Sequence, residues 1–176
     1  MTHLAVPKTY KLAIGGAFPR SESGRTYAVA DAEGNFVANA SKASRKDARD
    51  AVVAARAAVK GWSGATAYNR GQVLYRIAEL LEGRRAQFVD EITRLEGVSV
   101  AAANAQVDAS IDLWIWYAGW TDKHAQVAGN GNAVSGPYFN ISVPEPTGVV
   151  AVIVPQGSSL LGFVSAVAPP LVTGNT

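Results

Sequence analysis

The sequence contains no cysteine and relatively little charge. The absence of Cys from its 176 residues excludes a disulfide scaffold, a thiolate zinc site, an iron–sulfur cluster and a cysteine nucleophile within them. Charged residues make up 17% of the chain, against roughly 25% in an average soluble protein. Because hydrophobic residues make up 48% and the net charge is only +2, the chain is not of the disordered class. The length fits one folded domain with a substantial core.

A concentrated basic patch and a long apolar run are also missing. The longest basic runs are the pairs Arg45-Lys46 and Arg84-Arg85, so we expect no nucleic-acid partner. Residues 124–176 carry a single charge, on Glu145, but Gly and Pro interrupt them too often for a membrane span of about 20 apolar residues. The N-terminus also lacks the apolar region of a signal peptide. We therefore expect a cytoplasmic protein with no membrane partner and a buried, uncharged tail.

The first part of the chain predicts short strands followed by helices. Strands are expected at residues 11–14, 25–29 and 36–38. Ser44 and Asp47 resemble a capping box ahead of apolar residues at helical spacing. Four helices are expected: one from this box to Gly61–Gly64, one over about 68–82, one between Gly83 and Gly97, and one over about 99–126.

The C-terminal part predicts two strands and one helix. Apolar and polar residues alternate over 138–143, which is typical of a half-buried strand. Val149–Val154 is apolar at every position, as in a parallel strand buried on both faces. A turn and a helix over 160–167 follow, with Ser158 or Ser159 as the N-cap. Because such a strand needs neighbours, we expect it to be covered by further sequence or by another chain.

Four signatures occur in order along the chain and resemble the aldehyde dehydrogenase superfamily. The family patterns are I-G-G and N-P-A-T-G-E, Y-Y-A-G-W-A-D-K, E-P-x-G-V-V-x-x-I-x-P-W-N-F-P-L-L, and A-P-A-L-A-x-G-N-T. The matching residues here are Ile14–Gly16 and Asp31–Asn35, Trp116–Lys123, Glu145–Pro155 with Leu160-Leu161, and Ala168-Pro169 with Gly174–Thr176. Any one of them is weak, whereas four in the right order are specific.

The resemblance implies the first third of an α/β enzyme. It implies a β-hairpin and four-helix layer over 1–137, an oligomerisation strand over 138–146, and the first β–α unit of an incomplete Rossmann-type domain over 147–176. The complete family enzyme oxidises an aldehyde to a carboxylate: a Cys thiolate attacks, hydride passes to NAD or NADP, and water hydrolyses the thioester. Its Cys and Glu lie further along, so we expect a truncated member that is inactive alone and binds no cofactor tightly.

The resemblance also points to one turn. The family's Asn in P-W-N-F-P donates its side-chain amide to the oxyanion, and Gly157 stands at that position here. Gln156 replaces the Trp and Ser159 the second Pro. The backbone of Val154, Pro155 and Gln156 matches positions that line the nicotinamide end of the cofactor. With Gly157 in place of Asn, no catalytic residue is expected, as in a pseudo-catalytic branch of the family.

Other candidate residues favour structural roles. Asp108 and Asp112 lie one helical turn apart and could hold a cation, but a solvated surface is the better interpretation. Neither His3 nor His124 has the neighbours of a metal site, so we expect no metal. The aromatic residues of 114–120 have the spacing of a core or a subunit interface.

Three functions remain open at this point. The chain is a segment of an NAD(P)-dependent aldehyde dehydrogenase, a non-catalytic subunit, or an unrelated α/β binding domain. The first two imply a homo-oligomer, or a hetero-assembly with a dehydrogenase chain, through Tyr138–Val143 and the uncharged tail. The four ordered signatures disfavour the third.

Overall fold

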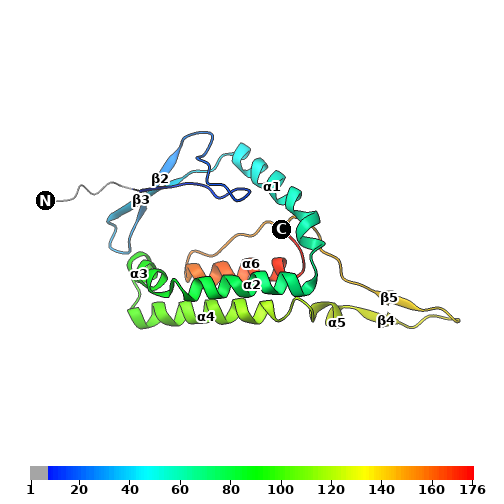
Figure 1. The fold of residues 1–176 in the computed structure, drawn as a ribbon. Helices are drawn as coiled ribbons and strands as arrows, with labels where there is room; N and C mark the ends of the chain where they lie inside the picture. The colour runs from blue at the N-terminus through cyan, green and yellow to red at the C-terminus, as the bar shows by residue number, and fades with distance from the viewer. Residues whose placement is uncertain (1–7) are drawn as a thin grey trace.

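A computed structural model describes residues 8–176, which begin with a small three-stranded sheet (Figure 1). Its strands are β1 (Lys8–Tyr10), β2 (Thr26–Ala30) and β3 (Phe36–Ser41), in the order β1-β3-β2. β1 pairs parallel with β3, and β2 pairs antiparallel with it. The strand predicted at 11–14 is wrong: Ile14 forms only an isolated bridge with Ala17, because the positive φ angles of Gly15 and Gly16 turn the chain there.

Six helices make up about half of the described chain (Figure 1). They are α1 (Arg45–Ser63), α2 (Ala67–Glu82), α3 (Arg85–Glu96), α4 (Val100–Ala118), α5 (His124–Ala128) and α6 (Ser159–Val172). The prediction of one helix over 99–126 is wrong, since Gly119 caps α4 and a separate short helix follows. The N–H groups of Trp120 and Thr121 bond three residues back rather than four, which ends the α-helical ladder.

The predicted capping box at the start of α1 is confirmed. The Ser44 hydroxyl accepts from the Asp47 N–H at 3.2 Å, and the Asp47 carboxylate accepts from the Ser44 N–H at 2.8 Å. The same carboxylate accepts from the Ser21 hydroxyl at 2.7 Å and the Glu22 N–H at 3.2 Å. Asp47 therefore fixes the start of α1 and also ties it to the loop before β2.

The core lies where α2, α3, α4 and α6 pack together. It consists of Leu74, Ala78, Leu81, Val89, Ile92, Ala103, Val107, Ile111, Trp114, Val164, Ala168 and Val172. The helices α2 and α4 approach closely at Gly71, where a Cβ would lie 3.1 Å from the carbonyl oxygen of Ala118, the last residue of α4, and 2.8 Å from the Thr121 hydroxyl oxygen in the turn that follows. Within residues 8–176, no helix has the length and apolar character that crossing a bilayer requires.

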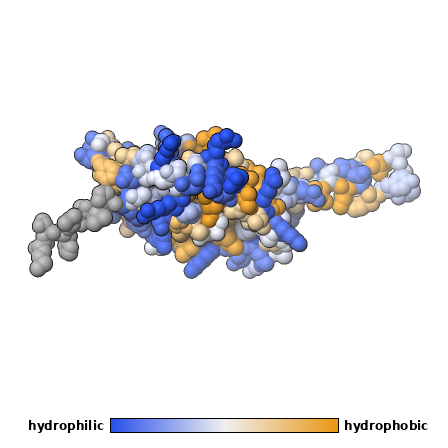
Figure 2. All heavy atoms as spheres, turned by 90° about the horizontal axis from the view of Figure 1, so that it is seen from above, coloured by the Kyte–Doolittle hydropathy of each residue, from blue (hydrophilic) through white to orange (hydrophobic). Residues whose placement is uncertain are grey.

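An antiparallel hairpin of β4 (Asn130–Asn132) and β5 (Asn140–Ser142) projects from the helical layer (Figure 1). It corrects one prediction, because the strand expected over 138–143 is shorter and exposed rather than half-buried. Phe139 is 90% exposed and Ile141 is 55% exposed, because the hairpin has no second layer beside it. Figure 2 shows hydrophobic residues interspersed with hydrophilic ones along this projection.

The segment Val149–Val154 is extended but forms no strand, so that prediction is wrong for the described residues. Ile153 is 98% exposed instead of buried. The physical reason is a lack of neighbours, since only Thr176 bonds beside the segment. The Thr176 N–H donates to the Gly148 carbonyl, and the Val150 N–H donates to the Thr176 carbonyl, each at 2.9 Å.

The last helix is longer than the sequence predicts. α6 continues past residue 167 to Val172 and contains Pro169 and Pro170. Neither proline has an N–H group, so each removes one helical hydrogen bond. Ala168 and Val172 are buried in the core, and this packing outweighs the lost bonds.

Candidate functional site

The turn from Pro155 to Ser158 joins the extended segment 149–154 to α6. Ser158 has φ 51° and is the only residue other than Gly with positive φ among residues 8–176. The Pro155 ring packs against Gly162 in the first turn of α6, where a Cβ would lie 2.5 Å from the Pro155 Cγ. At Gly157 an added Cβ would meet no atom within 4 Å. The turn is thus anchored at Pro155 and open at the predicted oxyanion position.

The N-terminus of α6 is capped by two other helices. The Glu96 carboxylate at the end of α3 accepts from the Ser159 N–H at 2.9 Å and from its hydroxyl at 2.6 Å. The Gln106 side-chain oxygen, on α4, accepts from the Leu160 N–H at 3.1 Å. The prediction of a local serine cap is wrong: Ser158 is at the N-cap position but is left-handed, and its side chain makes no cap bond.

Glu96 and Gln106 also contact each other. The Gln106 side-chain N–H donates to the second Glu96 oxygen at 3.2 Å. Partial burial opposes the ionisation of Glu96, but the bonds from Ser159 and Gln106 prevail and hold its pKa below the ordinary value. The first turn of α6 therefore faces a fixed negative charge.

That charge decides which cofactor group this turn can accept. A free helix N-terminus binds phosphate through its N–H groups and its dipole. Here the first two N–H groups of α6 are taken, and Glu96 would repel an anion, so the turn does not fit the pyrophosphate of a dinucleotide. The backbone of Val154 and Gln156 makes no hydrogen bond with residues 8–176 and stays available, so the nicotinamide contact predicted for Val154, Pro155 and Gln156 stays a prediction.

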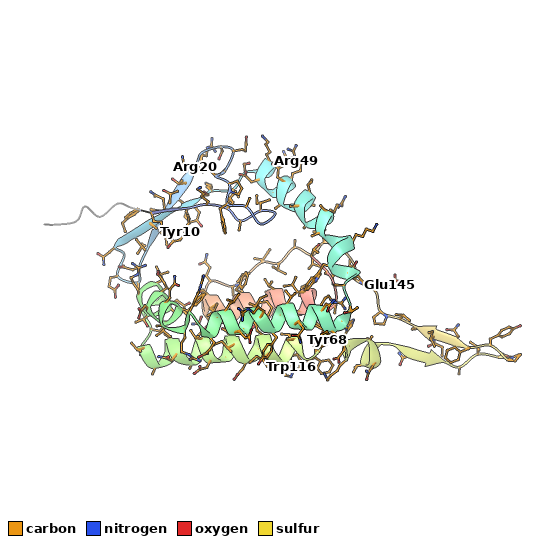
Figure 3. All side chains as sticks on the ribbon, in the orientation of Figure 1. Tyr10, Arg20, Arg49, Tyr68, Trp116 and Glu145 are labelled. Carbon is orange, nitrogen blue, oxygen red and sulfur yellow. The ribbon has the colours of Figure 1, made fainter. Side chains whose placement is uncertain are left out.

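A groove of about 630 Å³ runs beside the N-terminal half of α6. It is lined by Ala109, Asp112, Leu113, Trp116, Tyr117 and Leu161. Trp116 is half-exposed and packs edge-on against Tyr117, with ring centroids 4.8 Å apart. Trp114 lies in the core instead, so the aromatic cluster divides between core and surface. Figure 3 shows Trp116 on α4 and Tyr68 on α2, in the half of the layer nearer the hairpin.

Asp108 and Asp112, the two carboxylates considered as cation ligands, have different surroundings. Asp108 pairs with Arg85, which also binds Glu82 at 2.7 Å, whereas Asp112 faces the groove. No cluster of three or more acidic or histidine side chains suited to a metal ion occurs within residues 8–176. His124 lies beside the Thr121 carbonyl at 3.2 Å, and His3 is outside the described residues.

Sequence reasoning missed Glu96 and Gln106. The only local signal at Glu96 is that it precedes Gly97, which ends α3 in the left-handed conformation. Nothing in the pattern of residues indicates that its partner lies 63 residues further on.

Comparison with known proteins decides the family. Residues 18–176 match the family model for the "Aldehyde dehydrogenase family". The chain belongs to this family. It is 34% identical to human retinal dehydrogenase 2 over 175 residues, which are 96% of this chain and 33% of that protein. It is 31% identical to the mitochondrial benzaldehyde dehydrogenase of Antirrhinum majus, covering 94% of this chain and 31% of that one.

Solved structures agree in fold. An aldehyde dehydrogenase from Bacillus cereus superposes with a TM-score of 0.90 at 28% identity, over 96% of this chain and 35% of that one. PnpE, solved in complex with nicotinamide adenine dinucleotide, gives 0.89 at 27% identity, over 95% and 34%. The expected family and its α/β fold are confirmed. The chain spans between a fifth and a third of the length of its curated relatives.

Proposed function

We propose that these residues are the N-terminal part of an NAD(P)-dependent aldehyde dehydrogenase that oxidises aldehydes to carboxylates in the cytoplasm. The backbone hydrogen bonds of Thr176 carry the proposal. Thr176 lies opposite Val149 and bonds to the two residues that flank it, Gly148 and Val150. In a parallel pair of strands, a residue bonds in this way to both neighbours of the residue opposite it. α6 therefore returns the chain alongside its preceding segment, as in the β–α–β unit of a dinucleotide-binding sheet.

The three segments have different tasks in this proposal. Residues 1–137 supply the sheet and the helical layer, 138–146 the oligomerisation strand, and 147–176 the start of the cofactor domain. No cysteine is present among the 176 residues, so these residues alone have no dehydrogenase activity, and the thiolate comes from elsewhere in the assembled enzyme. NAD or NADP binds to the complete enzyme and accepts the hydride.

The test is aldehyde oxidation by the full protein that contains these residues. NADH or NADPH formation is followed with short aliphatic and aromatic aldehydes, and the 176 residues alone are the control. Activity in the full protein but not in the 176 residues supports the proposal. A full protein that binds neither cofactor contradicts it and favours a non-catalytic subunit, an alternative that Gly157 supports because it offers no side-chain donor.

We propose further that a second copy of the protein, or a homologous dehydrogenase chain, covers the hairpin through Tyr138–Val143. An exposed row of large apolar side chains is typical of an association surface, and here it comprises Tyr138, Phe139, Ile141 and Val143. Phe139→Ser is expected to lower the oligomer mass measured by light scattering. Tyr27→Ser, a large exposed side chain on β2, is the control. Unchanged mass in Phe139→Ser would contradict this interface.

A further inference from the structure

Glu96 lies where its charge serves a helix other than its own. It is the last residue of α3, and a carboxylate at a helix C-terminus is disfavoured by the helix dipole. The same carboxylate lies at the N-terminus of α6, where the dipole favours it and where it accepts two bonds from Ser159. No acidic residue occurs in the first turn of α6 itself. The charge of Glu96 therefore acts on α6 and on the turn that precedes it.

We infer that Glu96 is a positioning residue that holds the Pro155–Ser158 turn, and with it Gly157, against the helical layer. Gln106 assists by bonding to both Glu96 and the Leu160 N–H. The contact belongs to this chain's own departure from the family pattern. A proline at the position of Ser159 would have neither an N–H group nor a hydroxyl, and Ser159 donates through both.

The turn needs such an anchor because its own residues restrain it little. Gly157 lacks a side chain, and Ser158 is held in the left-handed region, which costs free energy for a residue with a Cβ. A bond from Glu96 to the adjacent Ser159 fixes the turn from the C-terminal side, and the Pro155–Gly162 contact fixes it from the other. The catalytic consequence rests on the proposed function, since it requires that this turn faces the reacting aldehyde.

The experiment measures the turn and the reaction separately, in the full protein. Glu96→Ala and Glu96→Gln are compared with Glu79→Gln, a surface carboxylate paired with Arg76 at 2.8 Å. Hydrogen–deuterium exchange of residues 156–162 is expected to speed up about tenfold in Glu96→Ala and less in Glu96→Gln, which retains an acceptor. Exchange of α2 is expected to stay unchanged, and so is every segment in Glu79→Gln.

Steady-state kinetics supply the second measurement. Displacing the turn should lower kcat between about tenfold and 100-fold in Glu96→Ala, with partial recovery in Glu96→Gln. Unchanged exchange at 156–162, or equal acceleration throughout α2, overturns the anchoring. Faster local exchange with unchanged kcat overturns the positioning role. If no variant, nor the wild type, oxidises aldehydes, the proposed function fails, whereas the exchange data still decide whether Glu96 holds the turn.

Discussion

The side-chain oxygen of Asn175 accepts a hydrogen bond from the Gly148 N–H at 2.8 Å, linking the end of α6 to the start of the extended segment 149–154. The Asn175 side-chain N–H groups donate to the Thr173 hydroxyl at 2.8 Å and the Pro170 carbonyl at 3.3 Å. Asn175 is buried, so all of its polar atoms depend on these partners. One side chain thus sets the position at which Thr176 meets Val149.

Removing this side chain should destabilise the protein markedly. Asn175→Ala leaves buried donors and acceptors unpaired, which predicts a loss of about 2–3 kcal/mol in the free energy of unfolding. Urea titration followed by tryptophan fluorescence measures it, and the exposed Asn69→Ala should change stability by less than about 0.5 kcal/mol. A loss below about 1 kcal/mol for Asn175→Ala would show that the bond to Gly148 adds no net stability.

The stability of the protein should fall with acid as Asp47 protonates. The Ser21 hydroxyl first, and then the Ser44 N–H, lower the pKa of Asp47 from 3.8 to about 2. Because the folded-state pKa is below the unfolded one, this contribution is complete above about pH 4 and is lost as the pH falls toward 2. Urea unfolding is measured at pH 7, 4, 3 and 2. The free energy of unfolding should be higher for wild type than for Asp47→Asn at pH 7, and the difference between the two should become smaller as the pH falls. Asp50→Asn, which removes only a surface pair with Arg49, should follow wild type throughout; a constant difference for Asp47→Asn would disprove the linkage.

Local signals in the sequence predicted the helical layer well. The capping box of α1 lies within four residues, and the glycines that end α2 and α3 directly follow the last helical residues. Such features depend on neighbours in sequence, so they can be recognised without the fold. The aldehyde dehydrogenase signatures extended this to the family and the fold class.

Contacts between distant segments could not be predicted in the same way. Val149–Val154 has the composition of a buried strand, but burial requires partner strands, and only Thr176 bonds to it here. Glu96 caps α6 across 63 residues, and no periodicity relates the two positions. Pro169 and Pro170 predict a helix end, yet core packing of Ala168 and Val172 carries α6 past them.

The close approach of α2 and α4 at Gly71 predicts opposite effects for two glycine substitutions. A Cβ at Gly71 would lie 2.8 Å from the Thr121 hydroxyl oxygen and 3.1 Å from the Ala118 carbonyl oxygen. Gly71→Ala should therefore cost about 1–3 kcal/mol through overpacking. In α1, a Cβ at Gly61 meets no atom within 4 Å, so Gly61→Ala should add about 0.5–1 kcal/mol through helix propensity. Thermal unfolding of both variants measures whether each substitution lowers or raises the stability. If Gly71→Ala stabilised the protein as much as Gly61→Ala, α2 and α4 would have to move apart without cost.

The oxyanion position offers the most direct functional test. Gly157 has room for a side chain and a φ angle outside the left-handed region, so Gly157→Asn should leave stability within about 0.5 kcal/mol of wild type. If the turn faces the reacting aldehyde in the full protein, the added amide should raise kcat about 100-fold, the size of the effect of one oxyanion donor. Gly157→Ala has the same backbone restriction without a donor and should leave kcat near wild type. Both variants add a Cβ that stiffens the turn, but only the Asn variant adds an amide that can donate a hydrogen bond. Equal kcat values for the two variants would therefore show that the side chain at position 157 does not contact the oxyanion.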